Sequence, residues 1–173
     1  ATPELTLAAK VAVLCSNAHI AYSPEQNDYR LLGDPTEGAL TAFAWKTGLP
    51  KEEFLKTHRL VNDWPFDYQK KFHAAIAEAD NQPFLALTGA PEVIMELSNE
   101  RLIEGGAVPL DPEARKRITD DFLLLSSEGF RVIGFAFRES VTPDANPDRL
   151  PPLVFGGLFA MHDGLRPDIR EAV

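Results

Sequence analysis

The first residue with evident binding chemistry is Glu37, within the stretch LGDPTEGAL at residues 32–40. Asp34 is a favourable N-cap residue, and Pro35 suits the first helical position because its missing N–H is not needed there. Glu37 stands three residues after the cap, where its carboxylate can accept a hydrogen bond from the N–H of Asp34 in a capping box. The same carboxylate is an acceptor for a ligand that carries N–H donors. The two roles compete for the same oxygens.

Three later stretches carry other residue types suited to ligands. Phe66 lies at the end of an expected strand, and Lys71 follows a few residues later. Thr88 and Gly89 lie where a strand turns into a helix, and glycine lets a ligand approach the backbone because it has no side chain. Arg131 stands at the start of an apolar strand. Taken singly, these stretches also fit a core aromatic, a helix start and a surface arginine.

Residue types for covalent or metal chemistry do not occur in productive patterns. The four histidines show no metal-ligand spacing with one another or with Cys15, the single cysteine. No serine lies in a nucleophile elbow, and no glycine-rich phosphate loop occurs. Lys46-Thr47-Gly48 resembles part of a phosphorylation motif, but Trp45 stands where the acceptor aspartate would be. We therefore predict neither a catalytic residue nor a metal ligand.

The composition indicates an acidic globular domain. At 173 residues, the chain is long enough for one domain with a core of ordinary size. Its formal net charge of −9 argues against nucleic acid or an anionic membrane as a partner. No apolar run approaches the roughly 20 residues that a membrane-spanning helix needs. The single cysteine excludes an internal disulfide and fits a reducing compartment.

Capping signals and hydrophobic periodicity predict the elements that must position these residues. We expect helices over residues 3–19, 35–47, 50–57, 93–97 and 112–128. We expect strands over residues 29–32, 58–66, 71–79, 84–88, 130–138 and 153–161. A turn is expected at residues 80–83, and Gly156-Gly157 suggests a bulge or a close backbone approach. Strands joined by hairpins in mid-chain predict an α+β fold, a twisted antiparallel β-sheet with flanking helices, rather than a doubly wound parallel sheet.

Together, these stretches resemble a known pattern in the same order along the chain. GDPTEGAL at residues 33–40 resembles a GDPTE-x-AL motif, PFDYQKK at 65–71 a PF-x-x-x-x-K segment, and GAPE at 89–92 a KGAPE turn. Arg131 resembles the arginine of a G-x-R strand, LCSN at 14–17 the end of a first helix, and HDGLRP at 162–167 a DPxRP stretch. In this pattern the chain resembles the cytoplasmic nucleotide-binding domain of type II P-type cation-transporting ATPases, a group that includes the calcium pumps. The resemblance covers nearly the whole chain.

The resemblance implies that the ligand is ATP and that its adenine is bound by Phe66 and Glu37. Phe66 would stack on the adenine ring, an interaction worth about 1 kcal/mol beyond burial. Glu37 would accept a hydrogen bond from the exocyclic amine, directly or through water.

The resemblance also implies how the rest of the nucleotide is bound. Lys71 would lie near the ribose or the phosphates as a mobile positive charge, and Arg131 would contact phosphate oxygens. Gly89 would let the nucleotide approach the backbone closely. Thr88 stands where the family usually has lysine, and a threonine donates a hydrogen bond without supplying charge. We expect an isolated domain to bind ATP weakly, with a Kd of roughly 0.1–10 mM.

The chain is expected to be part of a longer polypeptide. Residues 1–163 would form the nucleotide-binding domain, and residues 164–173 would begin the return into the phosphorylation domain, because RPDIREAV at 166–173 reads as a helix cut short. In the intact pump, the phosphorylation and actuator domains would be partners, and Mg²⁺ would accompany ATP. The resemblance thus implies a cytoplasmic domain of an integral membrane protein, itself not embedded in the membrane. The chain lacks the phosphorylated aspartate, so it should bind ATP without hydrolysing it.

Two other interpretations remain open at this stage. The chain fits an acidic protein-interaction module whose nucleotide pocket has degenerated, with Thr88 as the supporting residue. It also fits a free-standing soluble α+β enzyme, although no nucleophile, acid–base pair or metal cluster supports that interpretation.

Overall fold

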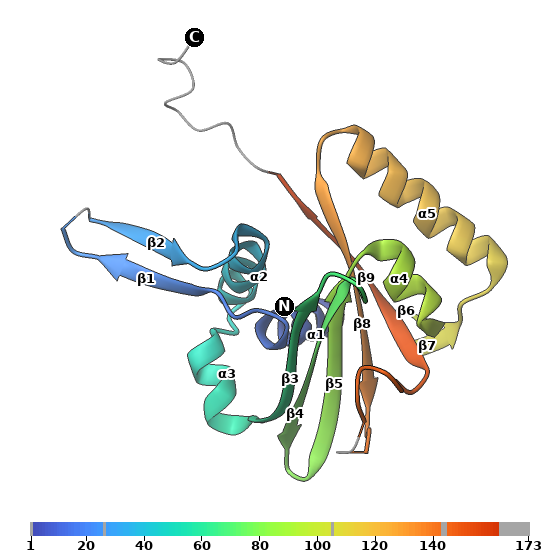
Figure 1. Cartoon of the computed structure of the whole chain (residues 1–173), viewed down its shortest axis with the longest axis horizontal. Coiled ribbons are helices and arrows are strands. Elements are labelled where there is room, and N and C mark those ends of the chain that lie inside the picture. Colours follow the sequence, from blue (N-terminus) through green and yellow to red (C-terminus); the bar gives the residue numbers. More distant parts are fainter. Residues whose placement is uncertain (1, 26, 105, 143–144, 163–173) are drawn as a thin grey trace.

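The computed structural model describes residues 2–25, 27–104, 106–142 and 145–162. Within these residues, seven strands form one sheet in the order β3-β4-β5-β8-β9-β6-β7 (Figure 1). Their bounds are β3 Arg59–Asp67, β4 Phe72–Ala79, β5 Gln82–Gly89, β6 Ser98–Ile103, β7 Gly106–Pro109, β8 Arg131–Glu139 and β9 Leu153–Met161. Neighbouring strands are antiparallel except β6 and β9, which pair in parallel. The predicted α+β fold with flanking helices is confirmed.

Helices cover both faces of the sheet (Figure 1). On one face lie α1 (Pro3–Leu14), α2 (Pro35–Lys46) and α3 (Lys51–Thr57), whose buried residues share one core cluster with alternate residues of β4, β5 and β8. On the other face lie α4 (Pro91–Glu96) and α5 (Pro112–Ser127). Alternation along β4 shows the arrangement, because Ala75 and Ala77 belong to the first cluster while Ala74 and Ile76 belong to the second.

The hairpin between β4 and β5 shows how local sequence fixes the register of the sheet. Asp80 and Asn81 form its two-residue turn with φ values of 51° and 59°. Aspartate and asparagine tolerate this left-handed region better than most residues, as a tight hairpin turn requires. The resulting register pairs His73 with Thr88, and Thr88 pairs in turn with Phe135 of β8.

The expected bulge at Gly156-Gly157 is confirmed. The pairing of β8 with β9 shifts register between Phe135 and Ala136, opposite this glycine pair. A Cβ atom on Gly156 would lie 2.2 Å from the ring of Phe135, so only glycine leaves room for that ring.

The prediction of a first helix running to His19 is wrong. The helix α1 ends at Leu14, and His19 begins β1 (His19–Ser23), which pairs with β2 (Asp28–Leu32) in a hairpin that projects from the body of the domain (Figure 1). The apolar pattern continues past Leu14, but Ser16 and Asn17 form hydrogen bonds with α2 that a continued helix would not allow. Tertiary hydrogen bonds therefore override local propensity here.

Residues 163–173 lie outside the described residues, and with them the expected domain boundary at residue 163, the segment 164–173 and the helix predicted from residue 166. In the described part of the chain, no helix combines the length and apolarity needed to cross a membrane.

Candidate functional site

The first turn of α2 places Glu37 toward the turn that follows α1. Asp34 caps the helix as predicted, because its Oδ1 accepts the N–H groups of Thr36 at 2.8 Å and Glu37 at 3.2 Å. The carboxylate of Glu37 reaches away from its own helix, and its Oε2 accepts the N–H of Asn17 at 2.7 Å. At least one of its oxygens thus serves a tertiary contact rather than a capping box.

Glu37 belongs to a cluster with His73 and Asp63, hereafter the Glu37–His73–Asp63 cluster. The side chain of His73 is only 2% exposed, and its Nε2 lies 2.6 Å from Oδ1 of Asp63. Its Nδ1 lies 3.8 Å from Oε1 of Glu37, and within the described residues it has no hydrogen-bond partner. A buried imidazole therefore lies between two carboxylates on this face of the sheet.

His73 is one of the four histidines to which the sequence assigns no metal-binding role. Its position did carry a signal, since it lies in a run of six buried residues at the start of β4, where a polar side chain needs polar partners. The partners themselves were not visible, because Asp63 and Glu37 lie 10 and 36 residues earlier, in other elements.

Lys51 and Ser16 complete the polar surroundings of Glu37. Nζ of Lys51 donates a hydrogen bond to the carbonyl oxygen of Ser16. Burial lowers the pKa of Lys51, and the nearby charges of Asp63 and Glu37 oppose this change. The hydroxyl of Ser16 donates to the carbonyl oxygen of Glu37 at 2.9 Å. The turn after α1 is therefore tied to both α2 and α3.

Thr88 lies beside this cluster, inside the domain. It is 5% exposed and pairs with His73 across β4 and β5. The thiol of Cys15 lies next to Thr88 and donates to the carbonyl oxygen of His73 at 3.9 Å. Burial raises the pKa of this thiol. The structure thus places Thr88 among buried groups rather than on an open surface.

Lys71 and Gly89 meet through the backbone. Lys71 has a φ of 59°, and its carbonyl oxygen accepts the N–H of Ala90 at 3.0 Å. A Cβ atom on Gly89 would lie 2.4 Å from that carbonyl oxygen, so the chain itself occupies the space that the absent side chain leaves. The Nζ atom of Lys71 lies 3.9 Å from Oε1 of Glu92 with both side chains more than half exposed, and such a pair is weak.

Phe66 lies at the end of β3 with much of its ring uncovered. It is 44% exposed and contacts Tyr68 edge-on, with 5.4 Å between the ring centroids. The next residue, Asp67, pairs with Phe72, which pairs in turn with Gly89. Phe66 and Gly89 therefore lie at the same end of β3 and β5, the strands on either side of β4.

Arg131 connects β8 to the first turn of α2. Its Nη1 donates a hydrogen bond to Oγ1 of Thr36 at 2.6 Å, although 95 residues separate the two. This contact brings Arg131 to Thr36, the residue that precedes Glu37 in the first turn of α2.

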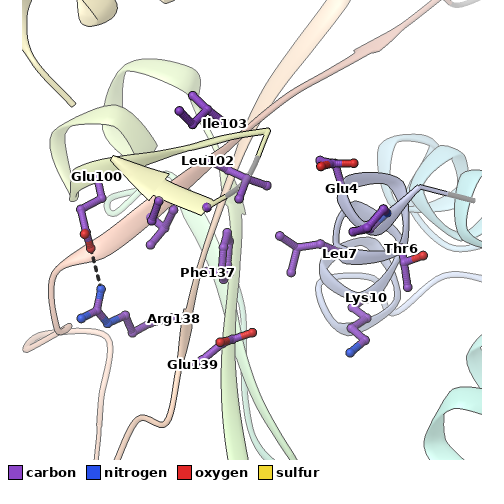
Figure 2. Close-up of a pocket in the computed structure, with 14 residues that line it drawn as sticks. Glu4, Thr6, Leu7, Lys10, Glu100, Leu102, Ile103, Phe137, Arg138 and Glu139 are labelled. Atoms are coloured by element: carbon purple, nitrogen blue, oxygen red, sulfur yellow. Dashed lines mark hydrogen bonds and ion pairs between the residues drawn. The ribbon is translucent and has the colours of Figure 1, made fainter. Parts of the chain in front are cut away.

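A separate cavity lies away from these residues. It has a volume of about 980 Å³ and is bounded by α1, β6, β7 and the far end of β8, with Leu7 and Lys10 facing Leu102 and Phe137 across it (Figure 2). None of the six residues predicted to bind the ligand lines it. In the described part of the chain, no group of three metal-ligating side chains could hold a metal ion.

Comparison with known proteins identifies the family. A family model described as "P-type ATPase, cytoplasmic domain N" matches residues 4–168. The chain belongs to this family. The suspected resemblance to a nucleotide-binding domain of the calcium-pump type is confirmed.

Relatives of this N domain are ion-transporting ATPases. It is 34% identical over 165 residues to "Calcium-transporting ATPase" of Bacillus subtilis (strain 168), covering 92% of this chain and 18% of the relative. It is 29% identical over 188 residues to "Sodium/potassium-transporting ATPase subunit alpha-A" of Artemia franciscana, covering 99% and 18%. It is 30% identical over 183 residues to "Potassium-transporting ATPase alpha chain 2" of Homo sapiens, covering 95% and 17%. The N domain thus spans less than a fifth of the length of these relatives.

Proposed function

We propose that this N domain binds ATP and that, within an intact P-type ATPase, it presents the γ-phosphate to the catalytic aspartate of a separate phosphorylation domain. The parent protein would be an ATP-driven cation pump of the membrane, with this chain as a cytoplasmic domain. The phosphorylation and actuator domains of the same polypeptide would be its partners. The observation that carries the proposal is the contact of Arg131 with Thr36, which brings a phosphate-binding type of side chain to the turn that bears Glu37.

Adenine would be bound between Phe66 and Glu37. The half-exposed ring of Phe66 offers a rigid aromatic face for stacking. One oxygen of Glu37 is engaged by Asn17, which leaves acceptor capacity on the carboxylate for the exocyclic amine.

The phosphates would be bound by Lys71 and Arg131, and Gly89 and Thr88 would contribute at the strand end between them. Among the described residues, Nζ of Lys71 has a weak, exposed pair with Glu92, so its ammonium group is available to a polyanion. In the intact pump, Mg²⁺ would neutralise the phosphate charge, and we assign it to the phosphates and the phosphorylation domain rather than to side chains of this chain.

Replacement of Phe66 tests the proposal. We expect wild-type chain to bind ATP with a Kd of roughly 0.1–10 mM, seen as NMR shift changes around Phe66 and Glu37. Phe66→Ala should abolish these changes, while Tyr68→Ala, which removes the neighbouring and more exposed aromatic ring, should keep them. Wild-type spectra that do not change at several millimolar ATP would refute nucleotide binding.

A second candidate function is an acidic protein-interaction module with a degenerate nucleotide pocket. The observation that favours it is the burial of Thr88 at the position where the family usually has a lysine. Under this alternative, Phe66→Ala changes only stability, because no nucleotide contact is lost.

A further inference from the structure

One nitrogen of the buried imidazole of His73 has no hydrogen-bond partner among the described residues. Its Nε2 makes a short contact of 2.6 Å with Asp63, whereas its Nδ1 faces Oε1 of Glu37 across 3.8 Å and has no hydrogen-bond partner in the described residues. Leaving a buried polar atom unpaired costs about 1–3 kcal/mol, so this arrangement needs an explanation.

A neutral imidazole does not suit these surroundings. If the single proton of a neutral ring lies on Nε2, this N–H donates a hydrogen bond to Asp63. Nδ1 then presents a lone pair to the carboxylate of Glu37. Two acceptors then face each other inside the domain, where repulsion is stronger than in water. A second proton on Nδ1 turns this repulsion into an attraction, and a small movement of Glu37 would complete a charge-assisted hydrogen bond.

The charges that face His73 from the surrounding elements also favour a second proton. Glu37 approaches from α2 and Asp63 from β3, and Lys51 of α3 lies near both carboxylates. Cys15 follows α1 and its buried thiol contacts the carbonyl oxygen of His73. Thr88 of β5 brings no charge. With a neutral imidazole, two carboxylates and one ammonium carry a net charge of −1, which a doubly protonated His73 balances.

We propose that His73 carries a proton on both ring nitrogens and acts as a positioning residue that holds the carboxylate of Glu37 in place for adenine. Only the positioning of Glu37 for adenine rests on the proposed nucleotide binding, since the protonation of His73 is a property of the free chain. Asp63 fixes the ring through Nε2, and Asn17 fixes the other oxygen of Glu37. Adenine affinity should therefore fall as pH rises and His73 loses its second proton.

The first measurement addresses His73 in the free 173-residue chain. Imidazole ¹⁵N NMR should show both nitrogens of His73 protonated at pH 6 and one proton lost as pH rises. Glu37→Gln should move the midpoint of this titration to lower pH, because the carboxylate facing Nδ1 is gone, and His19, exposed on β1, serves as an internal control. A His73 ring that stays neutral at pH 6, or a midpoint unchanged in Glu37→Gln, overturns the inference.

The second measurement compares ATP affinity between pH 6 and pH 8 in wild type, His73→Gln and His19→Gln. Taking differences between variants cancels the titration of ATP itself. If adenine binding shifts the midpoint of His73 by one pH unit, wild-type affinity changes by up to about tenfold, and His73→Gln should lose that part of the pH dependence. His19→Gln should keep the wild-type profile. A His73→Gln profile equal to that of wild type overturns the positioning role.

The two proposals fail in distinguishable ways. If ATP does not bind to any variant while His73 is doubly protonated and responds to Glu37→Gln, nucleotide binding is refuted and the Glu37–His73 coupling stands. If ATP binds with a pH dependence that does not involve His73, the positioning role is refuted and nucleotide binding stands. Should His73→Gln fail to fold, Asp63→Asn tests the same coupling, because it frees the imidazole ring at Nε2.

Discussion

The carbonyl oxygen of Lys71 occupies the space that a side chain on Gly89 would need. A Cβ atom there would lie 2.4 Å from this oxygen and 2.8 Å from Cα of Phe72, so β4 and β5 approach each other closely only because residue 89 is glycine. The same carbonyl oxygen accepts the N–H of Ala90, which fixes the start of α4. The glycine that suggested a ligand approach therefore has a structural role of its own.

Gly89→Ala should lower the free energy of unfolding by more than about 1 kcal/mol, because two backbone segments must separate to admit the methyl group. Gly48→Ala is the matched control. Gly48 has a φ of 86° with open space around it, so alanine there meets only the cost of a left-handed backbone. Urea unfolding measures both variants. A Gly89→Ala variant as stable as wild type would contradict the close approach.

Arg131→Ala should weaken ATP binding by about threefold to tenfold and binding of adenosine hardly at all, since the guanidinium group would act on phosphate oxygens. The loss should shrink as salt concentration rises. Arg59→Ala, which removes an exposed arginine paired with Glu78, is the control. Equal losses for ATP and adenosine would place Arg131 away from the phosphates.

Thr88→Lys should raise ATP affinity relative to adenosine affinity while lowering stability. The lysine side chain would extend outward with its aliphatic stem buried, so that its ammonium group reaches the phosphates. The stem must pass through a site that is 5% exposed, and this crowding costs stability. Isothermal titration and urea unfolding check the two effects. An unchanged ratio of the two affinities would show that residue 88 does not face the phosphates.

Asp67→Asn should reduce stability at neutral pH but not in acid. The N–H groups of Lys70 and Gln69 hold the pKa of Asp67 below its usual value. Because its pKa is lowered in the folded state, Asp67 contributes stability at pH values above the ordinary aspartate pKa near 4. This contribution is lost as pH falls through the lowered pKa. Urea midpoints at pH 7 and at pH 2.5 compare wild type with Asp67→Asn, and exposed Asp121→Asn provides the reference. Equal losses at both pH values would contradict the assignment.

Local signals were sufficient for most of the fold. Asp34-Pro35 and Asp111-Pro112 were recognised as helix starts, and both aspartates cap their helices in the structure. The pattern of apolar residues located β3, β4, β5, β8 and β9 of the large sheet, because each of these strands contributes buried or partly buried residues to the core.

The contacts that join distant segments could not be predicted. The end of α1 was misplaced because the hydrogen bonds of Ser16 and Asn17 to α2 involve residues about 20 positions away. The family motifs named Glu37 as a ligand-binding residue but gave no indication of His73 or Asp63. A buried polar group needs hydrogen-bond partners, but the fold can supply them from segments that are distant in the sequence. The residue type alone therefore does not identify those partners.

The turn after α1 has a consequence for how tightly the domain can hold a small molecule. Its backbone N–H at Asn17 and its carbonyl oxygen at Ser16 restrain Glu37 and Lys51 before any ligand arrives. The rotational freedom of these side chains is therefore lost during folding and need not be lost again on association. Mutations in this turn that leave the fold intact should weaken binding through entropy, without removing a single ligand contact.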